Sequence, residues 1–164
     1  MLFKTISYLK FLLKSSNQHG VHSPFVFNFV TKGLYNKRIR NNISVEYTEL
    51  KSLTKKEKKV ISKIIHYFNI ENICFDPIVL NENLNNEFKV LYLKLSDELN
   101  LRKLNNLTSK HLVVVHGIYK DKKSNLKWLE IIKKEDATVT MDLFYFGIIF
   151  FRKEQAKEHF NIRV

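Results

Sequence analysis

The residues best suited to chemistry gather near the start of the chain, in HGVHSPFVF, residues 19–27. His19 and His22 are three positions apart, a spacing that on a helix presents two imidazoles to one metal ion. No Cys or acid lies close to them in the sequence, so the ligand set would be incomplete. The Ser23 hydroxyl is a nucleophile only beside a base and an oxyanion site, which the sequence does not display. We therefore expect neither a metal site nor a catalytic nucleophile here.

The same motif has the pattern of a helix start. Ser23 is a preferred N-cap residue, and Pro24 suits the first helical position, where its missing N–H costs nothing. An apolar stripe follows at helical spacing: Phe25, Val26, Phe29, Val30 and Leu34. We therefore expect a structural role for the motif, with Ser23 as the cap and a histidine bonded to the loop backbone; a binding role for His19, Gly20, His22 and Ser23 stays open.

Two further candidates follow predicted strands. Residues 73–75 form a short buried-strand candidate that ends at Asp76, and HLVVVH, residues 111–116, is a continuous apolar strand typical of a parallel sheet. Open α/β sheets bind ligands at the carboxyl ends of their strands, where Asp76 and His116 stand. His116 could act as a base, but a histidine at a strand end is more often a loop residue. Both are weak candidates.

The remaining pattern alternates helices and strands, which predicts the α/β class. Thr54 and Glu57 form a capping box before an apolar periodic run that ends at Phe68, and Lys55, Lys56, Lys58, Lys59 and Lys63 make a solvated basic face on that helix. Other predicted elements are strands at 88–95, 138–145 and 147–152, and helices at 96–107 and 124–134. We expect a basic helical N-terminal region, 1–70, followed by an α/β core, 71–164.

Residues 2–13 read as an amphipathic helical arm. Apolar side chains recur at spacings of three and four, with lysines nearer the other side: Leu2, Phe3, Ile6, Leu9, Leu12 and Leu13 against Lys4, Lys10 and Lys14. We expect the rest of the domain to cover the apolar face, although a lipid interface or a partner would use the same pattern.

Charge is unevenly distributed in this chain of 164 residues with a formal net charge of +12. Residues 1–70 hold 13 Lys and Arg against 3 Asp and Glu. Such an excess suits an anionic partner, while AT-rich codon usage gives the same composition without one. Cys74 is the one cysteine and no secretory signal is evident, which favours the cytoplasm. The longest apolar run, 143–151, is far shorter than the roughly 18 residues of a membrane span.

Residues 137–164, ATVTMDLFYFGIIFFRKEQAKEHFNIRV, together with HGVHSPFVF, resemble a family of bacterial class I S-adenosylmethionine-dependent methyltransferases. The resemblance implies a Rossmann-like, mostly parallel sheet with the order third, second, first, fourth, fifth, seventh, sixth strand. It also implies a glycine-rich turn after the first strand that holds the cofactor, and an acid after the second strand that binds the ribose. Glycine is needed in that turn because backbone must approach the cofactor closely.

This chain departs from that pattern where the cofactor would bind. None of its glycines, Gly20, Gly33, Gly117 and Gly147, follows the first strand candidate. The sequence there is CFDPIVL, residues 74–80, in which proline lacks an N–H and the β-branched residues resist positive φ. We therefore predict no cofactor loop, with Asp76 as the one weak cofactor-binding candidate.

The chain is also short for the family. Counting back from the C-terminal match, residues 111–121 fit the fifth strand and 88–95 the fourth. The 12 residues between Phe75 and Phe88 are too few for two βα units. We predict a truncated sheet of about five strands in the order first, fourth, fifth, seventh, sixth. In an alternative alignment, 88–95 is the second strand and Lys94 takes the position of the ribose acid.

Three functions follow as hypotheses. The first is a methyltransferase-related pseudoenzyme that has lost S-adenosylmethionine and acts as a non-catalytic binding or interaction protein. The second is an active methyltransferase that keeps S-adenosylmethionine as its cofactor, with an unidentified substrate. The third is a basic module that binds nucleic acid or a membrane surface through residues 1–70. A first strand at the sheet edge would also invite pairing between copies into a homo-oligomer.

Overall fold

The computed structural model describes residues 2–38, 47–76, 89–95 and 107–164. The predicted helix at 96–107 lies outside these residues except for its last position, as does the sequence from Pro77 to Phe88. The chain divides into two units, which are described separately. One comprises Met1–Ser16 and Asn72–Arg163, and the other comprises Asn17–Glu71 and Val164.

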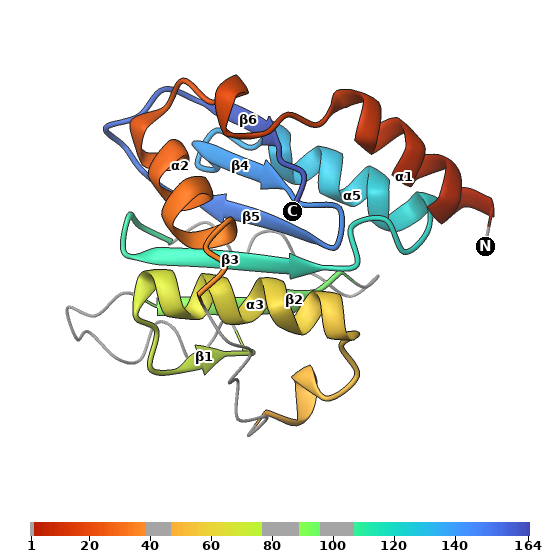
Figure 1. Ribbon diagram of the computed structural model, residues 1–164, viewed down its shortest axis with the longest axis horizontal. Helices are drawn as coiled ribbons and strands as arrows, with labels where there is room; N and C mark the ends of the chain where they lie inside the picture. Colours follow the sequence, from red (N-terminus) through yellow and green to blue (C-terminus); the bar gives the residue numbers. More distant parts are fainter. Residues whose placement is uncertain (1, 39–46, 77–88, 96–106) are drawn as a thin grey trace. The chain divides into compact units, whose positions relative to one another are not determined.

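A mixed six-stranded sheet forms the first unit (Figure 1). Its strands are β1 (Ile73–Cys74), β2 (Lys89–Lys94), β3 (His111–His116), β4 (Val139–Asp142), β5 (Phe146–Phe150) and β6 (Glu158–Asn161). Their order is β1-β2-β3-β5-β4-β6. The first three are parallel, β5 is antiparallel to β3 and to β4, and β6 is parallel to β4. The predicted α/β class is confirmed.

The order of five strands along the sheet is the order that the resemblance implies for a shortened chain. β2 lies between β1 and β3, the place expected of a fourth strand. The alternative alignment would put residues 88–95 on the other side of β1, so it is wrong. The sheet also has a sixth strand that the sequence did not predict, because EHFN, the sequence of β6, has one apolar residue and no alternation.

The turn between β4 and β5 begins earlier than predicted. β4 ends at Asp142, and Leu143–Tyr145 form the connection, with Phe144 at a left-handed φ of 67°. The Asp142 carboxylate closes this turn by accepting a hydrogen bond from the Phe144 N–H. The local side-chain bond ends the strand inside an apolar run that shows no break in the sequence.

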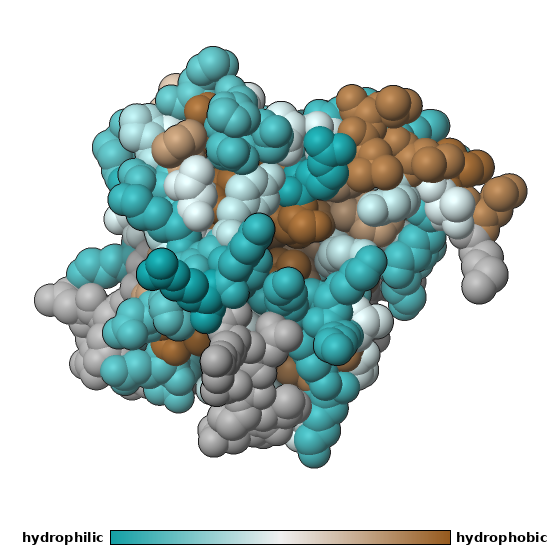
Figure 2. Space-filling model, viewed as in Figure 1, coloured by the Kyte–Doolittle hydropathy of each residue, from teal (hydrophilic) through white to brown (hydrophobic). Residues whose placement is uncertain are grey.

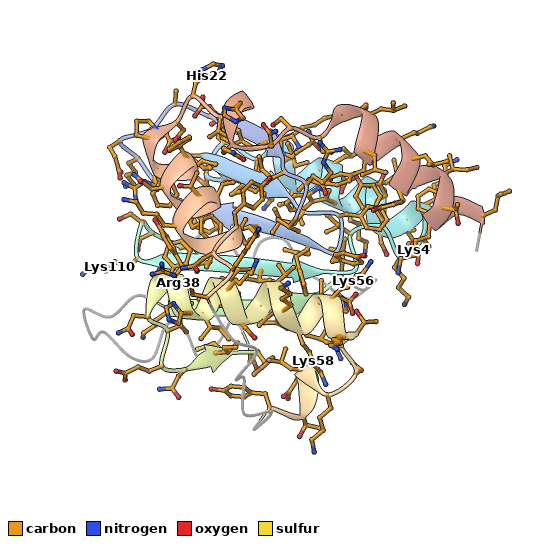
Figure 3. The ribbon with its side chains drawn as sticks, in the orientation of Figure 1. Lys4, His22, Arg38, Lys56, Lys58 and Lys110 are labelled. Atoms are coloured by element: carbon orange, nitrogen blue, oxygen red, sulfur yellow. The ribbon has the colours of Figure 1, made fainter. Side chains whose placement is uncertain are left out.

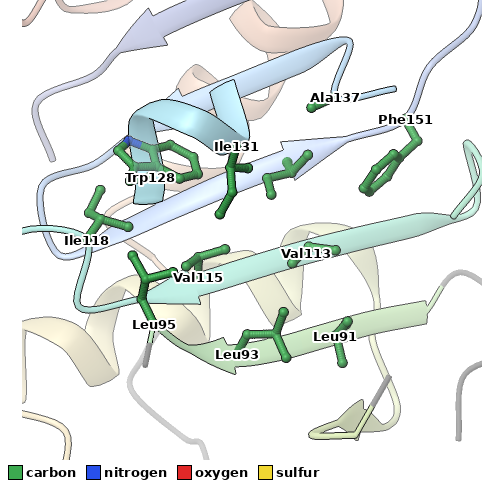
Figure 4. Close-up of a cluster of buried hydrophobic side chains, with 11 residues drawn as sticks. Leu91, Leu93, Leu95, Val113, Val115, Ile118, Trp128, Ile131, Ala137 and Phe151 are labelled. Atoms are coloured by element: carbon green, nitrogen blue, oxygen red, sulfur yellow. The ribbon is translucent and has the colours of Figure 1, made fainter. Parts of the chain in front are cut away.

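Helix α5 (Lys122–Lys133) packs on one face of the sheet (Figure 4). Asp121 caps it by accepting from the Ser124 N–H at 2.7 Å, so the helix begins two residues before the predicted start. Trp128 and Ile131 are fully buried against alternate residues of the strands. The cluster consists of Leu91, Leu93, Leu95, Val113, Val115, Ile118, Trp128, Ile131, Ala137, Ile149 and Phe151.

Helix α1 (Leu2–Lys14) belongs to the sheet unit, yet most of its apolar face is exposed. Its buried residues are Ser7 and Phe11. Four aliphatic residues are open to solvent, with exposed fractions of 75% for Leu2, 43% for Ile6, 57% for Leu9 and 88% for Leu13. The expectation that the domain covers this face is therefore wrong for these residues, because the helix is turned so that Phe11 faces the body of the unit.

The second unit is helical. It contains η1 (Gln18–Gly20), α2 (Pro24–Asn28), the π-helix η2 (Phe29–Leu34), η3 (Thr48–Leu50) and α3 (Lys55–Phe68). The capping box of α3 is confirmed: the Thr54 N–H donates to the Glu57 carboxylate at 2.8 Å, and the Glu57 N–H donates to Thr54 Oγ1 at 3.3 Å. Predicted apolar residues of α3, including Ile61 and Ile64, are buried.

Lys63 corrects one expectation for α3. The sequence placed it on a solvated basic face, but its ammonium group donates to the Leu34 carbonyl at the end of η2. This contact satisfies an acceptor that the helix end would leave free and places a cation at the negative end of the helix dipole. Burial, and to a smaller extent the charge of Lys59, lower the pKa of Lys63.

Gly147 in β5 provides a test of the packing. A Cβ built there would lie 2.5 Å from two ring carbons of Trp128, whereas a Cβ at Gly117 would meet nothing closer than Lys120 at 3.8 Å. We expect Gly147→Ala to cost about 2–3 kcal/mol of unfolding free energy in chemical denaturation, because the indole must shift. Gly117→Ala, with φ of 83°, should cost about 1–2 kcal/mol through backbone strain alone.

Trp128→Phe supplies the control for this prediction. The smaller ring does not reach as far over Gly147, so the cost of Gly147→Ala should shrink in that background. Equal costs in both backgrounds would contradict the packing account.

Candidate functional site at the carboxyl edge of the sheet

Five strands, β1, β2, β3, β4 and β6, end at the same edge of the sheet. β1, β2 and β3 are parallel, and β4 runs in their direction because both β3 and β4 are antiparallel to β5. This edge carries Asp76 after β1, Lys94 and His116 at the ends of β2 and β3, and Asp142 at the end of β4. Ligands of open α/β sheets bind at such an edge, so it is the candidate site.

Asp142 is the most unusual of these groups, and the sequence did not point to it. The residue is 2% exposed, and both of its oxygens are bonded. Tyr119 donates its hydroxyl hydrogen to Oδ2 at 2.6 Å, and the Phe144 N–H donates to Oδ1 at 2.8 Å. The Phe144 bond is local, two residues along the chain, whereas Tyr119 lies 23 residues away and is brought to the carboxylate by the folded sheet.

Burial dominates the electrostatics of this carboxyl. It raises the pKa of Asp142 to about 6. The hydrogen bonds from Tyr119 and Phe144 oppose this rise because they favour the charged form, and the nearby Trp128 N–H acts in the same direction. Trp128 Nε1 has no partner in hydrogen-bond geometry within the described part of the chain, so it acts as a nearby dipole. Burial and the neighbouring Asp142 raise the pKa of Tyr119, which keeps its proton. Asp142 can exchange a proton near neutral pH, but its oxygens already hold the turn.

His116 stands in an aromatic environment on this edge. Its ring is half-buried, and ring centroids lie 5.2 Å away for Phe146 and 6.0 Å away for Tyr92. Gly117 follows with a φ of 83°, a conformation that suits glycine, and its carbonyl accepts from the Lys120 N–H to turn the chain away from β3. The histidine therefore packs as part of the sheet.

The exposed Asp76 lies just past β1, while β2 separates that strand from β3. Two strand spacings, about 10 Å, therefore separate the backbones of β1 and β3. Asp76 and His116 come from the same edge, as the sequence predicted, but from strands that are not neighbours.

The HGVHSPF motif lies in the helical unit. Ser23 is buried and accepts from the Val26 N–H at 3.4 Å, which confirms it as the N-cap of α2. His19, Gly20 and His22 are exposed, and Figure 3 shows His22 pointing away from the ribbon. The His19 ring lies 3.3 Å from the Gln18 side-chain nitrogen, and the turn backbone is held by Asn17, which accepts from the His19 N–H at 3.0 Å.

The described residues contain no group of three or more His, Cys, Asp and Glu side chains that could hold a metal ion. Among the same residues, no helix has both the length and the apolar character needed to cross a membrane. In comparisons with protein-family models, curated proteins and solved structures, nothing matches this chain.

The pKa of Asp142 predicts how stability depends on pH. Because the folded-state value of about 6 lies above the ordinary 3.8, the unfolded chain releases this proton first. The carboxyl therefore lowers the free energy of unfolding as the pH rises from about 4 to 6, by roughly 3 kcal/mol at most, and adds no further change above that. Asp142→Asn cannot ionise, so its free energy of unfolding should rise relative to the wild type across this window in urea titrations.

Tyr119→Phe is the matched control for this experiment. It keeps the carboxyl but removes a hydrogen bond that favours the charged form, so the loss of stability should extend to higher pH than in the wild type. Parallel pH profiles for the wild type and Asp142→Asn would contradict the raised pKa.

Proposed function

We propose that this chain is a methyltransferase-like α/β protein that does not bind S-adenosylmethionine and works as a non-catalytic binding protein. The observation that carries the proposal is the order β1-β2-β3-β5-β4 with an antiparallel β5 between parallel neighbours. It equals the order first, fourth, fifth, seventh, sixth strand that the resemblance in residues 137–164 and 19–27 implies for a shortened member of the family.

Loss of the cofactor is supported by the sequence that follows β1. Residues 75–88 contain no glycine, and the segment that the resemblance aligns with the cofactor turn contains Pro77, which lacks an N–H. β2 lies between β1 and β3, the place of a fourth strand, so none of the described strands takes the place of the second strand that carries the ribose acid in the family. Among the described residues, Asp76 is the acid that follows β1, and one exposed carboxylate does not replace a cradle of backbone N–H groups.

A non-catalytic role is supported by the contacts of the other polar groups at this edge, which are structural. Both oxygens of Asp142 accept hydrogen bonds that hold the hairpin, and the residue is closed to solvent. His116 packs between aromatic rings. A general base must reach the proton it removes from the methyl acceptor, and Asp142 is not placed to do so.

The second hypothesis is an active methyltransferase with an unusual pocket. A measurement of cofactor binding distinguishes it from the first. We expect isothermal titration calorimetry of the full chain to show no binding of S-adenosylmethionine or S-adenosylhomocysteine at millimolar ligand, and the melting temperature to stay unchanged. Both ligands are needed because only the first carries the sulfonium charge.

Asp76→Ala and Asp136→Ala form a matched pair for any binding that is seen. Both acids are exposed, but Asp136 precedes β4 and so lies at the opposite edge of the sheet. Micromolar binding that weakens tenfold or more in Asp76→Ala and not in Asp136→Ala would replace the proposal with the active enzyme.

A further inference from the structure

The exposed apolar residues of α1 form one continuous stripe. Leu2, Ile6, Leu9 and Leu13 follow one another at spacings of four, three and four, which puts them on one side of the helix. Figure 2 shows the resulting hydrophobic surface over α1. It differs from scattered exposed leucines because its members are neighbours along one helix.

The packing of α1 fixes the direction in which this stripe points. Phe11 is buried and contacts Phe144 at 5.6 Å and Tyr119 at 6.5 Å between ring centroids. Tyr8 packs edge-on against Phe144 at 4.8 Å. At 100° per residue, Phe11 lies roughly opposite the centre of the stripe, so the aromatic contacts turn the aliphatic side chains outward.

The charges of α1 are all positive. Lys4, Lys10 and Lys14 are exposed, and the helix contains no acid. Lys10 follows Ile6 by four residues and precedes Leu13 by three, so it borders the stripe. Lys14 follows Lys10 by four residues and lies on the same side of the helix, whereas Lys4, labelled in Figure 3, lies nearer Phe11 than the stripe. Aliphatic side chains flanked by long basic ones can insert while the ammonium groups stay at the polar boundary.

We propose that α1 binds anionic membrane surfaces, lying in the plane of the interface. Its 13 residues span about 20 Å, less than the roughly 30 Å of a bilayer core, so the helix lies on the membrane. The stripe enters the boundary between headgroups and acyl chains, and Lys10 and Lys14 bind lipid phosphates. This inference is independent of whether the sheet binds S-adenosylmethionine.

The charge of α1 favours an anionic membrane as the partner of the stripe over a second copy of the chain and over nucleic acid. A second copy would bring the same lysines together without an acid in α1 to pair with them, in a chain of net charge +12. Nucleic acid would attract the lysines, but an aliphatic stripe offers its bases no aromatic ring for stacking. An anionic lipid surface uses both the stripe and the lysines.

Flotation with vesicles tests the proposal on the full chain. We expect binding to vesicles of equal parts phosphatidylcholine and phosphatidylglycerol, weakened by salt, and at least tenfold less binding to pure phosphatidylcholine. Leu9→Gln with Leu13→Gln should reduce binding tenfold or more. The matched control is Leu126→Gln with Leu129→Gln, two leucines of α5 that are 52% and 44% exposed, which should bind like the wild type.

A second pair of variants separates α1 from the overall charge. Lys10→Glu with Lys14→Glu should weaken vesicle binding tenfold or more, whereas Lys56→Glu with Lys59→Glu on α3 makes the same change in net charge and should have a much smaller effect. Unchanged circular dichroism and melting temperature establish that each variant is folded.

Three outcomes would overturn the proposal. One is the absence of binding to the anionic vesicles. Another is an equal effect of the two charge pairs, which assigns binding to net charge and not to α1. The third is a dimer in light scattering that dissociates in Leu9→Gln with Leu13→Gln while no vesicle binding is seen, which assigns the stripe to a second copy.

Discussion

The packing of the Trp128 indole against Gly147 is the constraint on which the sheet unit depends. A Cβ at position 147 would lie 2.5 Å from two ring carbons of the indole. Gly147 is paired with Val115 in β3 and with Asp142 in β4. One side chain of α5 therefore covers the place where three strands meet. The same contact helps to close Asp142 to solvent, which raises the pKa of the carboxyl and makes its bonds to Tyr119 and Phe144 necessary.

The parts of the fold that could be predicted are those with strong local signals. The uninterrupted apolar run of β3 and the capping box of α3 each specify an element through neighbouring residues alone, and both were predicted within a residue. β6 could not be predicted in this way, because its pairing with β4 comes from the sheet and not from its own polar sequence. The strand order followed from the resemblance, since periodicity does not specify which strands are neighbours.

The candidate site was predictable only in its location. The rule that ligands bind at the carboxyl edge placed Asp76 and His116 correctly at strand ends, but it gave no signal for Asp142. That acid lies in an apolar run, and its donor Tyr119 is 23 positions away in the sequence. An acid inside such a run is a usable signal, because a buried carboxylate must find hydrogen-bond donors. The partner itself requires the tertiary structure.

The orientation of α1 follows from the same aromatic group that completes the Asp142 network. Tyr119 and Phe144 stack with a centroid distance of 5.0 Å, and both contact Phe11. The observed rotation packs Phe11 and Tyr8 against Phe144 and leaves four aliphatic side chains in water, each worth about 1.5–3 kcal/mol if it were buried. Helical periodicity predicted an apolar face but could not specify what covers it. Because the observed rotation leaves the larger apolar surface in water, the helix gains most from an environment that accepts that surface, and the lysines beside it favour an anionic one.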